Sequence, residues 1–177
     1  QASLDNSKPV LNVGKAILKK YHQAGLPQQA YSVGLEYRDP HYWWLGTNVN
    51  YITESYISVS PIARTAIFFK NPANGFPFPE ATEARAKELL RQEKLDPVLL
   101  LNLTGGKTWR IKGKTLGLFM SVTNLLDTHY QTGGYEQARN ANFRQRNQDV
   151  SSGTPNFGNK YFQGYGRNYF VSLYLNL

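Results

Sequence analysis

Five segments of the sequence alternate between apolar residues and small or polar residues with a period of two. They span residues 30–38, 42–52, 98–111, 115–125 and 168–177. Successive side chains of a β-strand point to opposite faces of its sheet, so this alternation predicts five strands, each with one apolar face. The sequence therefore predicts an all-β fold.

The second face of each predicted strand is polar or small but rarely charged. In residues 42–52, for example, Asn48 and Asn50 oppose Leu45 and Val49. The solvent face of a soluble sandwich usually carries Lys, Glu and Thr, whereas this composition suits a hydrated interior. The apolar faces would then contact lipid, as in a transmembrane β-barrel. The residues expected to face the lumen are Asn48, Asn50, Asn102, Thr104, Thr123 and Tyr174.

The connections between these segments alternate between short and long. Residues 39–41 and 112–114 are predicted tight turns, whereas residues 53–97 and 126–167 are long connections. Outer-membrane barrels have short periplasmic turns and long extracellular loops, and compact soluble domains rarely hold two such long connections. We therefore expect residues 30–177 to form about five strands of a larger antiparallel transmembrane barrel. Residues 1–29 are expected to be an extracellular loop segment, in which residues 13–21 are a weak helix or strand candidate.

Large aromatic residues lie near the ends of the predicted strands. A strand rises ~3.3 Å per residue. For a strand tilted as in a membrane barrel, the distances from Tyr31 to Tyr37 and from Trp43 to Tyr51 correspond to roughly 15–20 Å across the membrane. This is close to the ~25 Å apolar band between the aromatic girdles of a membrane barrel, although soluble barrels also place aromatics at strand ends. The predicted girdle residues are Tyr31, Tyr37, Trp43, Tyr51, Trp109 and Tyr169.

The two long connections differ in composition. Residues 80–93 are predicted to form a loop helix, because Pro79 and Glu80 suit a helix start and Glu83 and Lys87 form a favourable i, i+4 pair. Residues 128–164 are rich in Gly, Asn, Gln, Arg and aromatics, which suits binding of a sugar or peptide and equally suits a large loop packed on its neighbours. The candidate ligand-binding residues are Tyr130, Tyr135, Arg139, Arg144, Arg146, Asn48 and Asn102.

Residues 122–127, Val-Thr-Asn-Leu-Leu-Asp, resemble the NxLD strand end near the C-terminus of TonB-dependent outer-membrane receptors. The resemblance covers residues 30–177. Three further strings strengthen it: residues 128–137, Tyr-Arg-Asp-Pro at 37–40 before Tyr-Trp-Trp at 42–44, and Leu-Asn-Leu at 101–103. The closing alternation resembles the family's C-terminal assembly signal, except that Leu177 stands where Phe is common. The resemblance implies a barrel of about 22 strands with an N-terminal plug, of which this chain supplies about a quarter.

The resemblance also implies a transport function in the outer membrane of a Gram-negative bacterium. The chain would be part of a TonB-dependent transporter that imports a bulky nutrient, such as a siderophore, glycan or peptide, into the periplasm. Implied partners are the plug and remaining barrel strands, from the same or a separate chain, the TonB complex through an N-terminal part, outer-membrane lipid and the nutrient. A surface lipoprotein is a further candidate partner. The chain opens at Gln-Ala-Ser-Leu-Asp without a start Met, which indicates a processed or excised piece.

Other functional classes find little support in the sequence. The three His residues are far apart, and neither HExxH nor GxSxG spacing occurs, so no enzyme is expected. Residues 105–108, Gly-Gly-Lys-Thr, lack the first Gly of a phosphate-binding loop, since Leu101 stands in its place. No Cys occurs, and neither a metal site nor a cofactor is expected. The net charge of +8 lies mostly in turns and loops, which does not suit nucleic-acid binding.

Two alternatives to transport remain open. The chain could be a soluble β-barrel or β-sandwich that binds a ligand such as a carbohydrate, in which case it would be monomeric without detergent. It could also belong to a surface adhesion or structural barrel, in which case the parent protein would lack a plug and TonB box. As an isolated membrane sheet it would expose two strand edges and a lipid-facing surface.

Overall fold

The computed structural model describes residues 14–176, and most of its regular structure is antiparallel β-sheet, as the sequence predicts. The contacts divide the chain into two compact units. The loop unit comprises the described part of residues 1–24 together with residues 57–93 and 134–160, and the sheet unit comprises residues 25–56, 94–133 and 161–176. No helix within residues 14–176 is long and apolar enough to cross a membrane.

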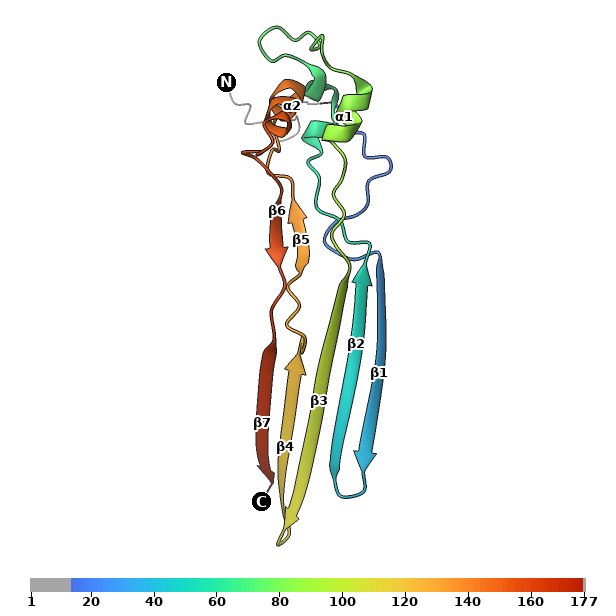
Figure 1. Cartoon of the computed structure of the whole chain (residues 1–177), viewed down its shortest axis with the longest axis vertical. Helices are drawn as coiled ribbons and strands as arrows, with labels where there is room; N and C mark the ends of the chain where they lie inside the picture. Colours follow the sequence, from blue (N-terminus) through green and yellow to red (C-terminus); the bar gives the residue numbers. More distant parts are fainter. Residues whose placement is uncertain (1–13, 177) are drawn as a thin grey trace, which may run out of the picture. The chain divides into compact units, whose positions relative to one another are not determined.

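The sheet unit contains one five-stranded antiparallel sheet (Figure 1). Its strands are β1 (Gln29–Asp39), β2 (Trp43–Thr53), β3 (Val98–Ile111), β4 (Lys114–Thr123) and β7 (Asn168–Asn176). The order across the sheet is β1-β2-β3-β4-β7. All five predicted strands are confirmed, with bounds that shift by two residues at most. The end of the fifth prediction, Leu177, lies outside the described residues.

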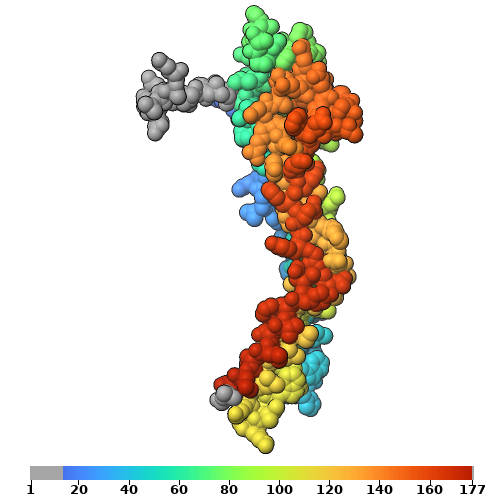
Figure 2. All heavy atoms as spheres, turned by 90° about the vertical axis from the view of Figure 1, so that its left-hand side faces the viewer, coloured from blue at the N-terminus to red at the C-terminus, as the bar shows by residue number. Residues whose placement is uncertain are grey.

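Strands β1 and β7 are the two edges of this sheet, and the described strands do not close into a barrel. Figure 2 shows β7, in dark red, along the side of the sheet unit that faces the viewer, where its side chains are uncovered. An edge strand presents a row of backbone N–H and C=O groups that can pair with a further strand. The sheet therefore has the capacity to extend at both sides.

The register places the apolar sides of all five strands on one face of the sheet. Val33 of β1 pairs with Val49 of β2, which pairs with Leu101 of β3. Across the other half, Met120 of β4 pairs with Val171 of β7. This apolar face is exposed, and its residues include Tyr31, Val33, Leu35, Tyr37, Leu45, Val49, Leu99, Trp109, Met120, Tyr169, Val171, Leu173 and Leu175.

The opposite face of the sheet carries small and polar residues together with a row of aromatic rings. The ring centroids of Trp44 and Phe119 lie 6.0 Å apart, and those of Phe119 and Phe170 are separated by the same distance. A Cβ atom at Gly117 would overlap the ring of Tyr174 on the neighbouring strand. Glycine is thus needed here because another side chain occupies the space above its backbone.

Both predicted short turns are confirmed. Residues 40–42 connect β1 to β2, and Tyr42 has a left-handed φ of 65° while its N–H donates to the carbonyl of Asp39 at 3.1 Å. Lys112 and Gly113 connect β3 to β4 with φ values of 49° and 81°. Positive φ at both central residues is the geometry of a two-residue hairpin turn that matches the twist of its strands.

Residues 124–127, the NxLD string, form a network of hydrogen bonds at the end of β4. Asn124 is buried, and its side-chain amide accepts from the N–H of Thr128 at 2.9 Å and donates to the carbonyl of Tyr165 at 3.1 Å. Asp127 Oδ1 accepts from the N–H of Arg167 at 2.8 Å, just before β7. The motif therefore ties the exit of β4 to the entry of β7.

The loop unit is built around a small apolar core. Its elements are the 3₁₀ turns η1 (Ile62–Arg64) and η2 (Ala66–Phe69) and the helices α1 (Glu83–Leu89) and α2 (Phe143–Ser151). The core consists of Ala63, Phe68, Phe78, Ala86, Leu89 and Phe143. Phe143, the first residue of α2, is 1% exposed and makes an edge contact with Phe68, with 5.9 Å between ring centroids.

Three expectations for the connections need correction. The helix predicted at residues 80–93 is only seven residues long: Thr82 caps its start by accepting from the N–H of Arg85 at 3.3 Å, and Leu90, whose backbone is not helical, caps its end. The long connection 126–167 holds α2 and a two-stranded sheet of β5 (Gln131–Tyr135) and β6 (Lys160–Gln163), none of which the sequence analysis predicted. Residues 14–21 form neither helix nor strand, and Val13 lies outside the described residues.

Candidate functional site

A buried ion pair holds together three segments of the loop unit. Arg64 and Glu136 are 6% and 7% exposed, and both guanidinium Nη atoms of Arg64 bond the Glu136 carboxylate, Nη2 to Oε1 at 2.6 Å. Arg64 also donates to the carbonyl of Leu90 at 2.8 Å and lies over the ring of Tyr21. The Glu136 carboxylate further accepts from the N–H of Ser60 at 2.9 Å.

The charge of this pair is matched inside the loop unit. Burial by itself would lower the pKa of Arg64, but the hydrogen bonds and the negative charge of Glu136 outweigh that effect and hold the pKa above its ordinary value. Glu136 begins the segment that leads to α2. The pair therefore anchors the start of residues 137–141, the segment that connects Glu136 to α2.

Helix α2 begins with a reciprocal cap. The side chain of Asn142 accepts from the N–H of Gln145 at 3.0 Å, and the Gln145 side chain accepts from the N–H of Asn142 at the same distance. This capping box satisfies two N–H groups that would otherwise lack partners at the helix start. Together with the burial of Phe143, it fixes the helix against the core.

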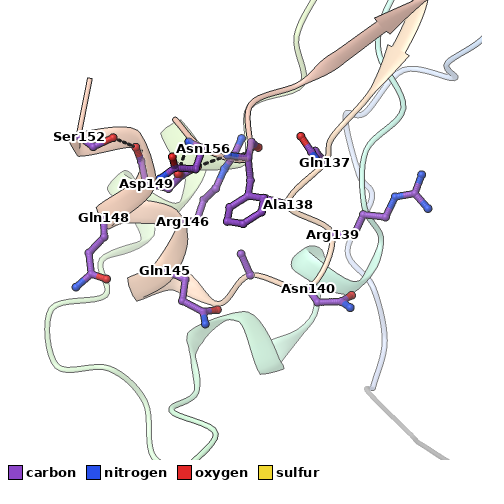
Figure 3. Close-up of a pocket in the computed structure, with 12 residues that line it drawn as sticks. Gln137, Ala138, Arg139, Asn140, Gln145, Arg146, Gln148, Asp149, Ser152 and Asn156 are labelled. Carbon is purple, nitrogen blue, oxygen red and sulfur yellow. Dashed lines mark hydrogen bonds between the residues drawn. The ribbon is translucent and has the colours of Figure 1, made fainter. Parts of the chain in front are cut away.

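A cavity of about 780 Å³ lies between α2 and residues 137–141 (Figure 3). Five carboxamide side chains, two arginines and one aspartate give it a polar lining, while the ring of Phe157, 57% exposed, adds an apolar surface. The volume is within the range of small-ligand sites. The polar lining residues are Gln137, Arg139, Asn140, Gln145, Arg146, Gln148, Asp149, Ser152 and Asn156.

Asp149, the only acidic residue of this lining, accepts hydrogen bonds from the backbone of the cavity wall. Asp149 Oδ1 accepts from the N–H of Asn156 at 2.7 Å, and Oδ2 accepts from the N–H of Phe157 at 3.4 Å (Figure 3). Arg146 donates from Nη1 to the carbonyl of Phe157 at 3.4 Å. These bonds hold residues 152–157 as a turn over the end of α2.

Several carboxamides of the lining remain available to a ligand. The side chains of Gln137, Asn140 and Gln148 make no hydrogen bond to any other residue in the described range 14–176. Each amide offers both donors and an acceptor. The cavity is therefore equipped to bind a polar ligand by hydrogen bonds and ring contact.

The structure brings together only some of the predicted ligand residues. Arg139 and Arg146 both line the cavity. The guanidinium of Arg139 lies 5.1 Å from the ring centroid of Tyr135, and both line a neighbouring cavity of about 340 Å³. Arg144 instead points to the core side, where it donates to Glu80 at 2.6 Å and lies over the ring of Phe78.

The other predicted ligand residues belong to the sheet unit. The ring of Tyr130 fills the space above Gly164, where a Cβ would overlap it. Asn48 donates to Ser32 at 2.8 Å, and Asn102 accepts from the N–H of Asn124 at 2.9 Å. These three side chains therefore have local packing or hydrogen-bonding roles, and their ligand role stays a prediction.

The six predicted girdle residues all lie on the apolar face. The rings of Tyr37 and Trp43 are 5.3 Å apart beside the first short turn, and those of Tyr31 and Tyr51 are 6.4 Å apart at the other end of the same strands. Trp109 lies near the second short turn, and Tyr169 is the second residue of β7. Contact of these rings with a membrane stays a prediction.

Sequence reasoning missed the carboxamides Gln145 and Gln148 because it did not recognise α2. The Asn-x-x-Gln spacing of residues 142–145 is a capping-box signal that could have revealed the helix. Within residues 14–176, no group of three or more His, Asp or Glu side chains is arranged to hold a metal ion. Comparison of the chain with protein-family models, curated proteins and solved structures gives no match.

Proposed function

We propose that this chain is part of a TonB-dependent outer-membrane transporter, in which the five-stranded sheet contributes to the barrel wall and the loop unit helps capture a bulky polar nutrient. The observation that carries the proposal is the alignment of five apolar strand faces on one exposed face of the sheet. Val33 and Leu35, on the part of that face that edge strand β1 contributes, are 71% and 75% exposed. A lipid-facing surface accounts for such exposure, because hydrocarbon solvates apolar side chains.

Two further features support a barrel wall. Both sheet edges are open, which leaves room for neighbouring strands from the rest of a barrel. Short turns of two or three residues lie at one end of the strands, and long connections leave from the other end. The NxLD string and the terminal strand are the sequence features that favour this particular family over other barrels.

The cavity beside α2 supports a ligand-capture role for the loop unit. Its lining combines free carboxamides with the cavity-facing arginines Arg139 and Arg146 and the exposed ring of Phe157. Polar groups and an aromatic ring together suit a hydroxyl-rich or peptide nutrient. The proposal assigns first contact with the nutrient to this cavity and passage to the polar face of the sheet.

The first test is to purify the protein from the outer-membrane fraction in mild detergent and measure the intact masses of all co-migrating species. The proposal expects a plug and further strands, either in a longer polypeptide that contains this chain or in a co-purifying partner. A lone 20.1 kDa species that is soluble without detergent would overturn the membrane assignment and favour the soluble ligand-binding alternative.

A matched pair of variants tests the lipid contact directly. Val33→Lys places a charge on the apolar face, whereas Ser32→Lys places the same charge on the opposite face of the same strand. In a membrane, the first change should cost roughly 2–4 kcal/mol more than the second in urea unfolding. If both faces of β1 were instead exposed to water, both positions would be surface sites, and the two costs would agree within about 0.5 kcal/mol.

A further inference from the structure

The β3–β4 hairpin ends in a cluster of cations without acidic neighbours in the sequence. Lys107, Arg110, Lys112 and Lys114 lie within eight residues, and no Asp or Glu occurs from residue 97 to residue 126. We call these four residues the cationic rim. Lys112 and Lys114 are exposed at the hairpin turn.

Within residues 14–176 none of the four rim cations forms an ion pair. Lys107 Nζ donates to the carbonyl of His41 at 2.6 Å, and the guanidinium of Arg110 lies 4.6 Å from the ring centroid of Tyr42. The acidic residues of β1, which is separated from β3 by β2, are paired locally, since Glu36 accepts from Arg38 and Asp39 is bonded to His41. The rim therefore carries uncompensated positive charge.

The register puts two of these cations on the border of the apolar face. Lys114 pairs with Ile111, beyond the row in which Trp109 pairs with Leu116 and Leu116 with Leu175. Lys107 lies on the same face, and its ammonium reaches the turn carbonyl of His41 instead of staying over the apolar residues. Long cationic side chains take this arrangement where apolar surface meets a polar layer.

The other end of the sheet lacks this excess of positive charge. There, Lys94 is bound to the carboxylate of Glu54. That pairing holds the pKa of Lys94 above its ordinary value. The two ends of the apolar face thus differ: Lys94 is paired at the end near the long connections, whereas the four cations at the short-turn end form no ion pair within residues 14–176.

We propose that the cationic rim binds the phosphate of an anionic phospholipid headgroup at the short-turn surface of the membrane. The inference rests on the proposed function, because the apolar face must first contact acyl chains. With that face in hydrocarbon, the rim lies at the depth of the headgroups, where phosphate oxygens can accept from the ammonium groups of Lys112 and Lys114. The fixed negative charge complements four cations that form no ion pair within residues 14–176.

The three Trp residues of the chain report directly on this rim. Trp43 and Trp44 begin β2 beside the first short turn, Trp109 precedes the second, and the sequence contains no other Trp. Bromine on an acyl chain quenches the fluorescence of a nearby Trp. The protein, reconstituted in vesicles, can therefore be titrated with brominated phosphatidylcholine or with brominated phosphatidylglycerol.

The informative variant is Lys112→Asn with Lys114→Gln, in which Asn is chosen because it tolerates the left-handed backbone of residue 112. The control is Lys70→Gln with Lys87→Gln, which removes the same charge from exposed positions of the loop unit. A far-UV circular dichroism spectrum checks that both variants retain the sheet. All measurements are repeated at high salt, which should weaken a headgroup contact.

The proposal expects the brominated anionic lipid to quench the parent protein at several-fold lower mole fraction than the neutral lipid, since each cation near an anionic surface contributes about fivefold. The rim variant should lose most of this preference, and the control should keep it. Equal quenching by both lipids, or a preference that survives in the rim variant, would overturn the headgroup site while leaving the membrane assignment standing. Absence of quenching by either lipid would overturn the proposed function itself.

Discussion

Replacement of Arg64 by methionine should open the loop unit and leave the five-stranded sheet intact. The guanidinium of Arg64 is the only cation that the structure places on the Glu136 carboxylate among residues 14–176. Methionine fills similar space without charge. The variant would therefore leave Glu136 as a buried carboxylate with the N–H of Ser60 as its remaining bond, and it would remove the donor to the carbonyl of Leu90.

The expected size follows from the burial of both partners. Removal of one member of a buried ion pair costs about 3–5 kcal/mol, because the other charge stays uncompensated. Since each 1.4 kcal/mol is a factor of ten in an equilibrium constant, local opening should become roughly 100- to 4,000-fold more frequent. Exchange of amide hydrogens through such openings should accelerate by the same factor.

Hydrogen exchange followed by mass spectrometry of peptides measures this effect within one sample. Peptides from residues 57–93 and 134–160 should lose protection, whereas peptides from β3 and β4 serve as the internal reference. Adding Glu136→Leu to Arg64→Met should restore much of the protection, because no buried charge remains. An unchanged exchange rate in the loop peptides, or a double variant as open as the single one, would refute the reasoning.

Two other perturbations test the packing and electrostatics. Gly117→Ala should destabilise the sheet by about 1–3 kcal/mol in urea unfolding followed by Trp fluorescence, because its Cβ would overlap the ring of Tyr174. Adding Tyr174→Ala to the same chain should recover most of that loss. A single variant Gly117→Ala with unchanged stability would contradict the close contact. The hydrogen bond from Arg144 holds the pKa of Glu80 below its ordinary value of 4.5. The stabilisation from this pair is therefore fully present above that pH and lost as pH falls through the lowered pKa, so exchange protection of residues 142–152 should fall on acidification in the parent protein and be insensitive to the same step in Glu80→Gln.

The five strands of the sheet could be predicted from the sequence because the pattern that indicates each strand lies within that strand. Each strand carries its own alternation, and the tight turns at residues 39–42 and 112–113 contain the Pro or Gly that such turns favour. Sequence did not reveal why the second face contains glycine, since Gly117 and Tyr174 are 57 residues apart and meet only through the register of β4 and β7. Packing across strands decides such positions, and periodicity does not report it.

The candidate site was predicted less well because its contacts are distant in sequence. Arg144 was expected to face a ligand, yet it bonds Glu80, 64 residues away. The pair of Arg64 and Glu136, separated by 72 residues, left no local pattern. Composition drew attention to Arg139 and Arg146, which line the cavity, but it could not separate cavity-lining cations from those that hold the loop unit together.

The long separation between Arg64 and Glu136 also has a consequence for the order of folding. Hairpins β1–β2 and β3–β4 close turns of two or three residues, and such local contacts cost little loop entropy and form early. The core of the loop unit, in contrast, needs Phe143 from α2 to meet Phe68 across an interval of the chain that contains both β3 and β4. We therefore expect a chain released before residue 143 to form its hairpins but not the cavity beside α2, so that the loop unit is completed only late in synthesis.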